Sequence, residues 1–345
     1  MKIGIVGVTG YGGIELYRLL TAHPDVETIS LYSSSQAGGT IKDIYSHMNT
    51  VTNHRLLDIQ PEQMKRELDV IFLAAPAGVS SELTPQLLGD KAKVIDLSGD
   101  LRLHNRNTYS QWYKKEAAPD SVLAQAVYGL PEWNKENIAS ADLIANPGCY
   151  PTAVLLGLGP LMRSHSADPS SIIIDAKSGV SGAGKNPSAI THFGHTQENF
   201  QIYKVNEHQH IPEIEQQLTE WNGAVTPITL STHLVPMTRG IMATMYMKLH
   251  EEITLRQLVE QYQAYYQDQP FVRVREEGNF PCTKDVYASN YCDICLALDN
   301  RTRRVTVVSV IDNLMKGAAS QAIQNMNLVC GLRETTGLEY LPVYP

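Results

Sequence analysis

One cysteine stands where a turn meets a helix, in the stretch IANPGCYPTAVLLGLGP at residues 144–160. Cys149 follows the turn sequence Asn146-Pro147-Gly148 and precedes an apolar run with helical character. A thiol at a helix N-terminus is near backbone N–H groups and the positive end of the helix dipole, which both favour the thiolate. Pro151 suits the first helical turn, where its missing N–H costs nothing. The position therefore suits a nucleophile for an acyl carbon, and the alternative is a small buried residue in a turn.

A nucleophilic cysteine in thioester chemistry needs a general acid/base, and histidine suits that role at neutral pH. In YKVNEHQHIPEIEQQL, His208 and His210 directly precede Pro212, which marks a helix start. Residues at a helix entrance can point into a cleft, so these two are the best candidates. His192 and His195 are the runners-up. A metal at His-x-His would need a third ligand that no Asp or Glu pairing selects, so we expect no metal site.

Three glycines, Gly7, Gly10 and Gly13, lie in GIVGVTGYGGIEL between an expected strand and an expected helix. Their spacing is a variant of the dinucleotide fingerprint, and glycines let the backbone approach a pyrophosphate at the helix N-terminus. We therefore expect a dinucleotide here, with a purely structural turn as the alternative. If so, Cys149 would form a thioester that hydride reduces to an aldehyde.

The second expected strand ends in SLYSSSQAGG, which bears on the choice of dinucleotide. An NAD site usually has an acidic residue at this point. Ser33, Ser34 and Ser35 are uncharged donors that suit a 2′-phosphate. Glu27 lies about 20 residues after Gly7, in the range of the usual acidic residue, but near the start of the strand. The serines favour NADP over NAD.

A second glycine-rich loop, GVSGAGKN at residues 179–186, matches the P-loop pattern except for Asn186 and the immediate Pro187, which argue against a nucleotide triphosphate site. Its backbone N–H groups and Lys185 could instead form a nest for a substrate phosphate or carboxylate, unless the loop is merely flexible. Two arginines are candidates for binding a substrate carboxylate: Arg102 in DLSGDLRL, at the end of an expected strand, and Arg239 in HLVPMTRGIM. Alternatively, Arg102 forms only a salt bridge with Asp100.

The elements around these motifs predict two domains. In the first half, short apolar runs alternate with helical patterns, which is typical of a doubly wound parallel sheet. The expected strands there are residues 2–8, 26–32, 68–76, 92–100 and 141–148. After about residue 165, alternating runs at 170–179, 241–249 and 291–312 predict an α+β domain with an antiparallel sheet, the last run forming two strands joined by a turn at Asp299-Asn300. A final helical pattern at 312–332 could return to the first domain.

The composition limits the classes of protein to which this chain can belong. A chain of 345 residues with 43% hydrophobic content can hold two cores. A net charge of −8 and no basic block argue against nucleic-acid binding. The apolar runs are too short for a membrane span, and we expect no signal peptide. Five scattered cysteines indicate reduced thiols and a cytoplasmic protein. Cys292 and Cys295 lie in a strand pattern, on opposite faces, so a shared metal is not expected.

The chain resembles the N-acetyl-gamma-glutamyl-phosphate reductase family along nearly its whole length. The shared motifs, in order, are GVTGYGG, DLSGDLRL, YGLPE, NPGCYPTA, KSGVSGAGK, HQHIPEI, LVPMTRGI and DNLMKGAASQAIQNMN. The resemblance implies NADP-dependent reduction of N-acetyl-L-glutamyl 5-phosphate to the semialdehyde and phosphate, in arginine biosynthesis, by a homo-oligomer (dimer or tetramer). Some members carry an arginine after the second strand, where this chain has only serines. The rivals are enzymes that reduce aspartyl phosphate or carrier-linked acyl phosphates, and a non-catalytic dinucleotide sensor.

The resemblance also implies site roles. Cys149 is the nucleophile, and His210 is favoured as the acid/base with His208 near the substrate. The remaining expected substrate-binding residues are Arg102, Ser178, Gly179, Lys185 and Arg239. The expected cofactor-binding residues are Gly7, Thr9, Gly10, Tyr11, Gly12, Gly13, Ser33, Ser34, Ser35, Ala75, Pro76, Ser98 and Asn313, the last near the nicotinamide amide. The expected fold joins a Rossmann-type NADP-binding domain, residues 1–148 completed by 313–345, to an α+β catalytic and oligomerisation domain, residues 149–312, with a mostly antiparallel sheet.

Overall fold

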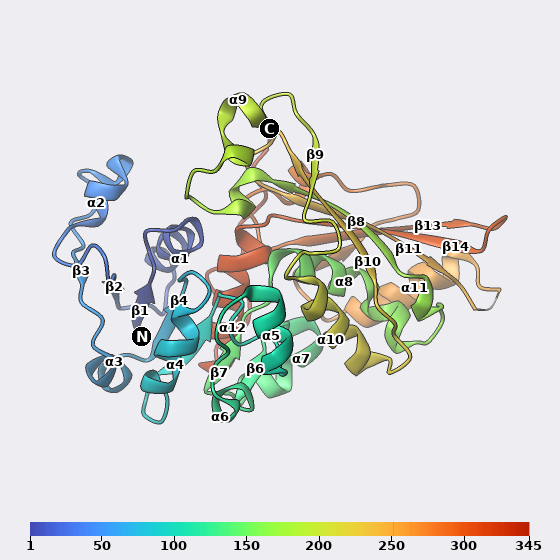
Figure 1. Ribbon diagram of the computed structural model, residues 1–345. Coiled ribbons are helices and arrows are strands. Elements are labelled where there is room, and N and C mark those ends of the chain that lie inside the picture. The colour runs from blue at the N-terminus through green and yellow to red at the C-terminus, as the bar shows by residue number, and fades with distance from the viewer. Residues whose placement is uncertain (251, 345) are drawn as a thin grey trace. The chain divides into compact units, whose positions relative to one another are not determined.

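The computed structural model describes residues 1–250 and 252–344 (Figure 1). The chain forms two compact units. Unit 1 comprises Met1–Pro147 and Ala318–Glu339, and unit 2 comprises Gly148–Gly317 with the residues from Tyr340 onward. Within the described residues, no helix has the length and apolar character that crossing a membrane would require.

Unit 1 is built on a parallel seven-stranded sheet with the order β3-β2-β1-β4-β5-β7-β6. Its strands are β1 (Lys2–Val6), β2 (Thr28–Tyr32), β3 (Leu56–Leu57), β4 (Val70–Leu73), β5 (Lys93–Asp96), β6 (Ala126–Tyr128) and β7 (Leu143–Ala145). The four residues of β4 are all apolar and fully buried, as expected for a strand covered on both faces. The chain starts at the middle of the sheet and winds outward in both directions, which is the doubly wound arrangement.

The helices of unit 1 follow the strands. They are α1 (Tyr11–Thr21), α2 (Ile41–Ile44), α3 (Pro61–Glu67), α4 (Val79–Leu87), α5 (Arg106–Tyr113), α6 (Asp120–Leu123), α7 (Pro131–Ala139) and α12 (Ser320–Val329), with a 3₁₀ turn at Ser46–Met48. Helix α12 is buried throughout. Its polar side chains have partners: the Asn325 amide donates to the Gly129 carbonyl and the Asn146 side chain, and the Asn327 amide oxygen lies 3.0 Å from His23 Nε2.

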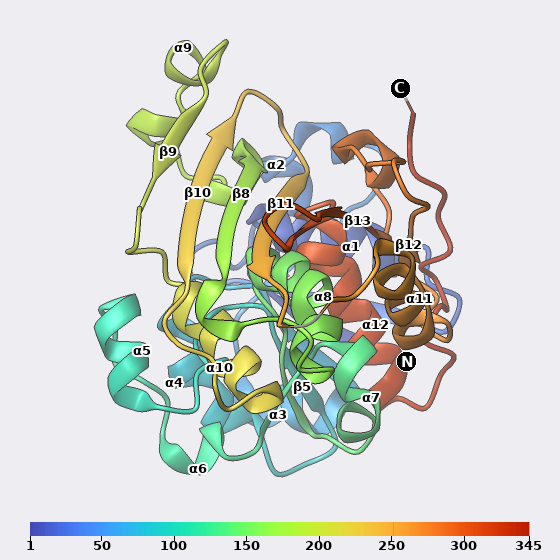
Figure 2. The ribbon, with the colours of Figure 1, turned by 90° about the vertical axis from the view of Figure 1, so that its right-hand side faces the viewer.

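Unit 2 contains a second seven-stranded sheet, with the order β12-β13-β14-β11-β8-β10-β9. The strands are β8 (Ile173–Gly179), β9 (Gln201–Tyr203), β10 (Thr229–Val235), β11 (Ile241–Lys248), β12 (Val272–Val274), β13 (Cys292–Asp299) and β14 (Arg304–Ile311). Only the β8–β10 and β12–β13 pairs are parallel. The other pairs are antiparallel, so the predicted mostly antiparallel sheet is confirmed. Figure 2 shows β9, β10, β8 and β11 side by side at one end of this sheet.

The long helices of unit 2 lie on the same side of its sheet (Figure 1). They are α8 (Cys149–Arg163), α10 (Ile211–Trp221) and α11 (Leu255–Tyr266). The short elements are helix α9 (Phe193–Thr196) and 3₁₀ turns at Pro169–Ser171, Val180–Ala183, Ala189–Thr191 and Thr283–Val286. A π-helix at Met315–Ala319 leads the chain into unit 1. The Tyr262 hydroxyl donates to the Gly157 carbonyl and that of Tyr266 to the Leu156 carbonyl, which ties α11 to α8.

Two boundaries differ from those predicted. The expected first domain comprised residues 1–148 and 313–345, but Gly148, residues 313–317 and the residues from Tyr340 onward group with unit 2. The reason is hydrogen bonding: Asn313 bonds to Gly240 and Ser181, and the Val343 N–H donates to the Tyr287 carbonyl. The turn between β13 and β14 is also longer than Asp299-Asn300, because Asp299 still pairs with Arg304 and residues 300–303 form the loop.

Candidate active site

Cys149 is the first residue of α8, in unit 2, as the turn sequence predicted. Gly148 is the N-cap, with extended backbone and no capping side chain of its own. The Thr152 N–H and hydroxyl both donate to the Gly148 carbonyl at 2.9 Å, which closes the first turn. The thiol is half-buried. The start of a 15-residue helix places Cys149 where a thiolate gains from the helix dipole.

A residue that the sequence reasoning missed supports this turn. Glu213 is fully buried in the first turn of α10, and its carboxylate accepts a 2.8 Å hydrogen bond from the Gly148 N–H. The carboxylate therefore satisfies a backbone donor immediately before Cys149. The acidic residue three positions after His210 was visible in HQHIPE, but only as a helix-start signal.

The two predicted histidines lie together beside the α8 N-terminus. His210 is the N-cap of α10, and its N–H donates to His208 Nδ1 at 3.1 Å. The two rings have centroids 4.7 Å apart, and their distances to the ring of Tyr150, the neighbour of Cys149, are 5.3 Å for His208 and 6.1 Å for His210. Burial, with a smaller effect of Lys204, lowers the pKa of His208 to about 3, so this ring is neutral at physiological pH.

A pair of tyrosines, also missed, completes the surroundings of Cys149. The hydroxyls of Tyr150 and Tyr203 are 3.1 Å apart, and the ring of Tyr203 lies 5.8 Å from that of His208. Burial raises the pKa of Tyr203 to about 12, and a thiolate at Cys149 contributes to the increase. Burial raises the pKa of Tyr150 further, with contributions from the neighbouring Tyr203 and, after it, from Cys149. Both phenols therefore stay protonated and can donate hydrogen bonds at neutral pH.

The backbone of Gly317 lies close to Cys149. A Cβ at this position would lie 2.9 Å from the Cβ of Cys149 and 3.3 Å from the carbonyl oxygen of Asp312. The Gly317 N–H donates to that same carbonyl, in the π-helical pattern that is frequent at functional sites. The DNLMKG motif therefore carries a glycine that no other residue could replace without displacing its neighbours.

The loop after β8 differs from the anion nest that we expected. The N–H groups of Gly179, Val180 and Ser181 donate to the carbonyls of Gly240, Met237 and Thr238, respectively, so they already have backbone partners. A Cβ at Gly179 would lie 2.7 Å from the Thr238 oxygen, which explains the glycine. Ser178 is buried, and its hydroxyl donates to the Gly179 carbonyl. The segment from Gly182 to Lys185 is the exposed part of the loop.

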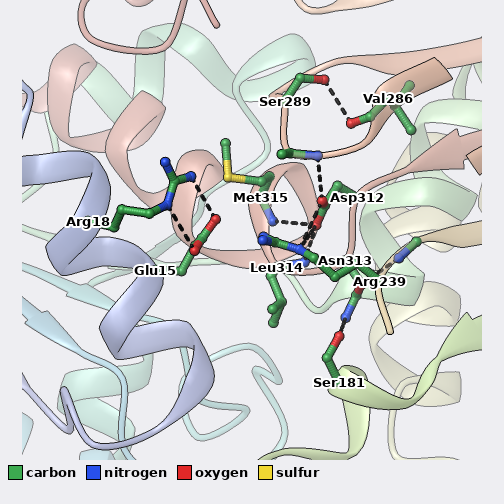
Figure 3. Close-up of polar contacts among 12 residues, drawn as sticks. Glu15, Arg18, Ser181, Arg239, Val286, Ser289, Asp312, Asn313, Leu314 and Met315 are labelled. Atoms are coloured by element: carbon green, nitrogen blue, oxygen red, sulfur yellow. Dashed lines mark hydrogen bonds and ion pairs between the residues drawn. The ribbon is translucent and has the colours of Figure 1, made fainter. Parts of the chain in front are cut away.

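Arg239 pairs with a buried carboxylate. Its Nε lies 3.1 Å from Asp312, whose carboxylate also accepts from the N–H groups of Ala288, Leu314 and Met315 (Figure 3). Burial raises the pKa of Asp312, and the positive charge of Arg239 opposes that increase. The guanidinium of Arg239 is thus oriented by a carboxylate that the sequence did not suggest.

The runner-up histidines and the C-x-x-C pair have other contacts. His192 caps α9 by accepting from the Gly194 N–H, and His195 Nε2 lies 3.0 Å from the Gln201 side chain. Both histidines are exposed. Cys292 and Cys295 are buried in β13. Residues 1–250 and 252–344 contain no cluster of three or more His, Cys, Asp or Glu side chains that could hold a metal.

Unit 1 carries the first glycine loop, and its geometry fits a dinucleotide. Gly7 follows β1 with a φ of 89°, and a Cβ there would lie 2.5 Å from the Ala74 carbonyl oxygen. A Cβ at Gly13 would lie 2.3 Å from the Gly7 oxygen. Gly10 is the N-cap of α1. Side chains at Gly7 and Gly13 would therefore collide with the backbone, and their absence permits the tight turn and the close helix–strand packing for which the fingerprint requires glycine. The Tyr45 hydroxyl, not predicted, donates to the Thr9 carbonyl.

Helix α1 also carries an ion pair between an exposed arginine side chain and the buried carboxylate of Glu15. Arg18 bonds to the Glu15 carboxylate through Nε and a terminal nitrogen, one helical turn apart (Figure 3).

The loop after β2 holds the three predicted serines, of which Ser34 and Ser35 are exposed. Ser33 is buried, and its hydroxyl accepts from the Gln36 N–H. The exposed pair is thus the accessible part of the SSS motif.

The DLSGDLR motif follows β5 and is mostly internal. Arg102 is buried and donates to the backbone carbonyls of Asn146 and Leu97 at 2.8 Å. The Asp100 carboxylate accepts from Gly78 and Ser81 N–H groups at the start of α4 and from the Tyr109 hydroxyl. Arg102 therefore stabilises the turn that precedes Cys149 in the chain.

Ser98 and Asp96 form the second part of this motif. The Ser98 hydroxyl donates to the Asp96 carboxylate at 2.8 Å, and the Ser98 N–H donates to the same side chain. Complete burial, with the nearby Asp100 charge, raises the pKa of Asp96 to about 6. The predicted cofactor contact of Ser98 would thus come from a hydroxyl that already orients a buried acid.

Comparisons with known proteins agree with this architecture. A family model described as "Semialdehyde dehydrogenase, NAD binding domain" matches residues 2–141, and one described as "Semialdehyde dehydrogenase, dimerisation domain" matches residues 149–313. The chain is 57% identical over 345 residues to N-acetyl-gamma-glutamyl-phosphate reductase from Bacillus mycoides, covering 100% of both chains. It is 56% identical over 344 residues to the protein of that name from Bacillus cereus, again covering 100% of both.

Solved structures show the same fold at low sequence identity. Aspartate semialdehyde dehydrogenase II from Vibrio cholerae matches with a TM-score of 0.73 and 18% identity, over 96% of this chain and 98% of that one. The Candida albicans aspartate semialdehyde dehydrogenase with NADP matches with a TM-score of 0.71 and 16% identity, over 95% and 98% of the two chains. The predicted fold class is confirmed, and the chain belongs to the semialdehyde dehydrogenase family and, within it, to the N-acetyl-gamma-glutamyl-phosphate reductases.

Proposed function

We propose that this chain catalyses the NADPH-dependent reduction of N-acetyl-L-glutamyl 5-phosphate to N-acetyl-L-glutamate 5-semialdehyde and phosphate, as a step of arginine biosynthesis. The observation that carries the proposal is Cys149 at the start of α8, beside the His208–His210 pair and the two tyrosines. The family membership and the names of the full-length relatives support the substrate and the pathway.

The first step is acyl transfer to sulfur. The Cys149 thiolate attacks the acyl carbon, a carbon–sulfur bond forms, and the bond from that carbon to the phosphate oxygen breaks with its electron pair. Phosphate leaves and a thioester remains. The N-terminus of α8 stabilises the thiolate, and Glu213 holds the turn in place through the Gly148 N–H. The exposed loop from Gly182 to Lys185 receives the leaving phosphate, with Lys185 as its cation.

The second step reduces the thioester. The bound dinucleotide supplies the hydride. His210 donates its proton to the developing oxyanion, which gives a hemithioacetal on Cys149. His210 then takes the hydroxyl proton back as the carbon–sulfur bond breaks, which releases the aldehyde and regenerates the thiolate. The low pKa of His208 supports His210 as the group that exchanges protons, because a neutral His208 ring can only orient its neighbour and the substrate.

The cofactor contacts remain as predicted from the sequence. Gly7, Thr9, Gly10, Tyr11, Gly12 and Gly13 hold the pyrophosphate, and Ala75, Pro76 and Ser98 line the neighbouring strand ends. The exposed Ser34 and Ser35, with Ser33, contact a 2′-phosphate and select NADP. The absence of an acidic side chain in the SSSQ stretch supports this choice, and the structure of the Candida albicans relative with NADP is consistent with it.

The substrate carboxylate binds Arg239, whose guanidinium is oriented by its ion pair with Asp312. The buried Arg102 is a second binding residue for the substrate. Ser178 and Gly179 shape the substrate loop, and His208 lies near the substrate. The active form is a homo-oligomer in the cytoplasm. The dimerisation description of the matched family model supports assembly, and the free state of all five cysteines agrees with a reducing compartment.

The test is the reverse reaction. The enzyme is mixed with N-acetylglutamate semialdehyde, NADP and phosphate, and absorbance of the reduced nicotinamide is followed. Parallel reactions replace the substrate with aspartate semialdehyde, replace NADP with NAD, or omit phosphate. A phosphate-dependent signal with the acetylated substrate and NADP is the expected result. A signal only with aspartate semialdehyde would identify the sibling activity, and no signal in any reaction would favour a dinucleotide sensor.

A further inference from the structure

A segment of unit 1 between β2 and β3 reaches the first glycine loop. It comprises residues 40–54 and carries α2 and the 3₁₀ turn at Ser46–Met48 (Figure 1). Within it, the hydroxyl of Tyr45 donates to the Thr9 carbonyl at 2.8 Å. Thr9 immediately precedes Gly10, the N-cap of α1. One side chain from outside the glycine fingerprint therefore bonds to the backbone of the fingerprint itself.

This segment has contacts of its own that hold Tyr45 in place. The side chain of Ile41 is fully buried, and the Ile41 N–H donates to the His54 carbonyl at 3.1 Å, which closes the segment at its base. A capping box starts α2, because the Asp43 carboxylate accepts from the N–H of Thr40 at 2.9 Å and from its hydroxyl at 2.6 Å. Tyr45 follows α2 directly, so its position depends on this short helix.

The Thr9 carbonyl takes its donor from outside α1. Within the described part of the chain, no backbone N–H donates to this carbonyl, and the first intrahelical bond runs from the Ile14 N–H to the Gly10 carbonyl at 3.0 Å. Burial, with a smaller effect of Tyr11, raises the pKa of Tyr45 to about 12, so its hydroxyl remains a donor at neutral pH. The bond fixes the peptide that joins Thr9 to Gly10, and this peptide sets the direction in which the chain enters α1.

That direction controls where the first N–H groups of α1 point. Those of Tyr11, Gly12 and Gly13 precede the first intrahelical bond, and the N-cap Gly10 has no capping side chain. Such N–H groups at a helix N-terminus bind phosphate anions. Resting on the dinucleotide of the proposed function, we propose that Tyr45 is a positioning residue, which fixes the start of α1 so that these N–H groups face the pyrophosphate. Tyr45 acts through the glycine loop and not through the adenosine end of the cofactor.

The experiment measures two dissociation constants without turnover, for Tyr45→Phe and the unmodified protein. NADPH is titrated by its fluorescence, and adenosine 2′-monophosphate, which lacks the pyrophosphate, is titrated by displacement of NADPH. We expect Tyr45→Phe to bind NADPH about fivefold more weakly, because one hydrogen bond of ordinary strength is lost, and adenosine 2′-monophosphate within about twofold of the unmodified protein. Tyr17→Phe is the matched control. It removes a hydroxyl that bonds to Thr52 and His54 instead of the glycine loop, and it should leave both constants unchanged.

Asp43→Ala tests the same inference from the other end of the segment. It removes the acceptor of the capping box, so α2 holds Tyr45 less firmly and NADPH should bind about threefold more weakly. Because Asp43 and Tyr45 act through one bond to Thr9, the double variant should be no weaker than Tyr45→Phe. Asp43 is exposed, so its replacement leaves the core intact. If Tyr45→Phe fails to fold, as judged by thermal melting, Asp43→Ala decides alone through the same two constants.

The outcomes separate the inference from the proposed function. Unchanged NADPH affinity in Tyr45→Phe would overturn the positioning role. An equal loss of affinity for both ligands would also overturn it and would assign Tyr45 to the adenosine end of the site. Absence of NADPH binding by the unmodified protein would instead reject the proposed cofactor.

Discussion

The buried carboxylate of Glu213 accepts a 2.8 Å hydrogen bond from the backbone N–H of Gly148, the residue before Cys149. This bond joins the first turn of α10, whose N-cap is His210, to the N-terminus of α8. The expected acid/base and the expected nucleophile are therefore held by one interaction between two helix starts. The rigidity of the pair depends on an acceptor that is fully removed from water.

Replacing Glu213 with Ala should slow catalysis and lower stability. The Gly148 N–H would be left buried without this acceptor, at a cost of about 1–3 kcal/mol. We expect a decrease in the unfolding free energy of that size and a slower reaction of Cys149 with iodoacetamide, followed by mass spectrometry. Glu213→Gln keeps a carbonyl acceptor and is the matched control. Equal alkylation rates in Glu213→Ala and the unmodified protein would contradict the role of the carboxylate.

Cys149→Ala should abolish turnover because no thioester can form. Binding of NADPH, measured by fluorescence titration, should stay near that of the unmodified protein, since the glycine loop belongs to a different unit. Cys282→Ala changes an exposed thiol and should retain full activity. Residual turnover at the unmodified rate in Cys149→Ala would rule out the covalent mechanism.

Gly317→Ala tests the close approach of the backbone to Cys149. A methyl group would have to fit 2.9 Å from the cysteine Cβ, and such overpacking typically costs about 1–3 kcal/mol. We expect a lower melting temperature and a loss of most of the activity. Gly223→Ala adds the same methyl group where no heavy atom lies within 4 Å and is the control. Identical melting and activity of the two variants would show that the site adapts freely.

His208 should make the protein less stable in acid. Its pKa is about 3 in the folded state, below the usual value of about 6.5, so the folded state disfavours its protonation. The stability that this histidine contributes is complete above pH 6.5 and is lost as the pH falls toward 3, by about 2 kcal/mol at pH 5. His208→Gln should remove this part of the pH dependence in urea unfolding. An unchanged slope between pH 7 and pH 5 in that variant would mean that other groups cause the loss.

Asp96 should make the protein less stable as the pH rises, which is the opposite of the effect of His208. Its pKa of about 6 lies above the usual value of about 3.9, so the folded state favours the protonated acid. The stability that Asp96 contributes is present below pH 3.9 and is lost as the pH rises through 6, by up to about 3 kcal/mol. Asp96→Asn should therefore be more stable than the unmodified protein at pH 8 but not at pH 4, as measured by urea unfolding. A variant that is less stable at both values would show that hydrogen bonds to Ser98 outweigh the ionisation.

Local patterns in the sequence predicted much of this arrangement. The turn sequence before Cys149 and the proline after His210 placed both residues at helix starts, because capping and proline preferences act over a few neighbouring residues. The glycine spacing and the alternating runs predicted the dinucleotide cradle and the two kinds of sheet for the same reason: strand and helix periodicity are local. The short strands β3, β6, β9 and β12 were missed, since two or three residues carry no period.

Tertiary structure decided the partners of the site residues. Glu213 meets Gly148 across 65 residues of sequence, Asn313 meets Ser181 across 132, and Arg239 meets Asp312 across 73. Tertiary contacts also explain why the loop at Gly179 differs from the expected anion nest: carbonyls of the 237–240 loop accept hydrogen bonds from its N–H groups. A buried polar group requires a partner, but only the packing of distant segments determines which one it finds. The sequence by itself thus determined which residues could do the chemistry, and the fold decided which other residues hold them in place.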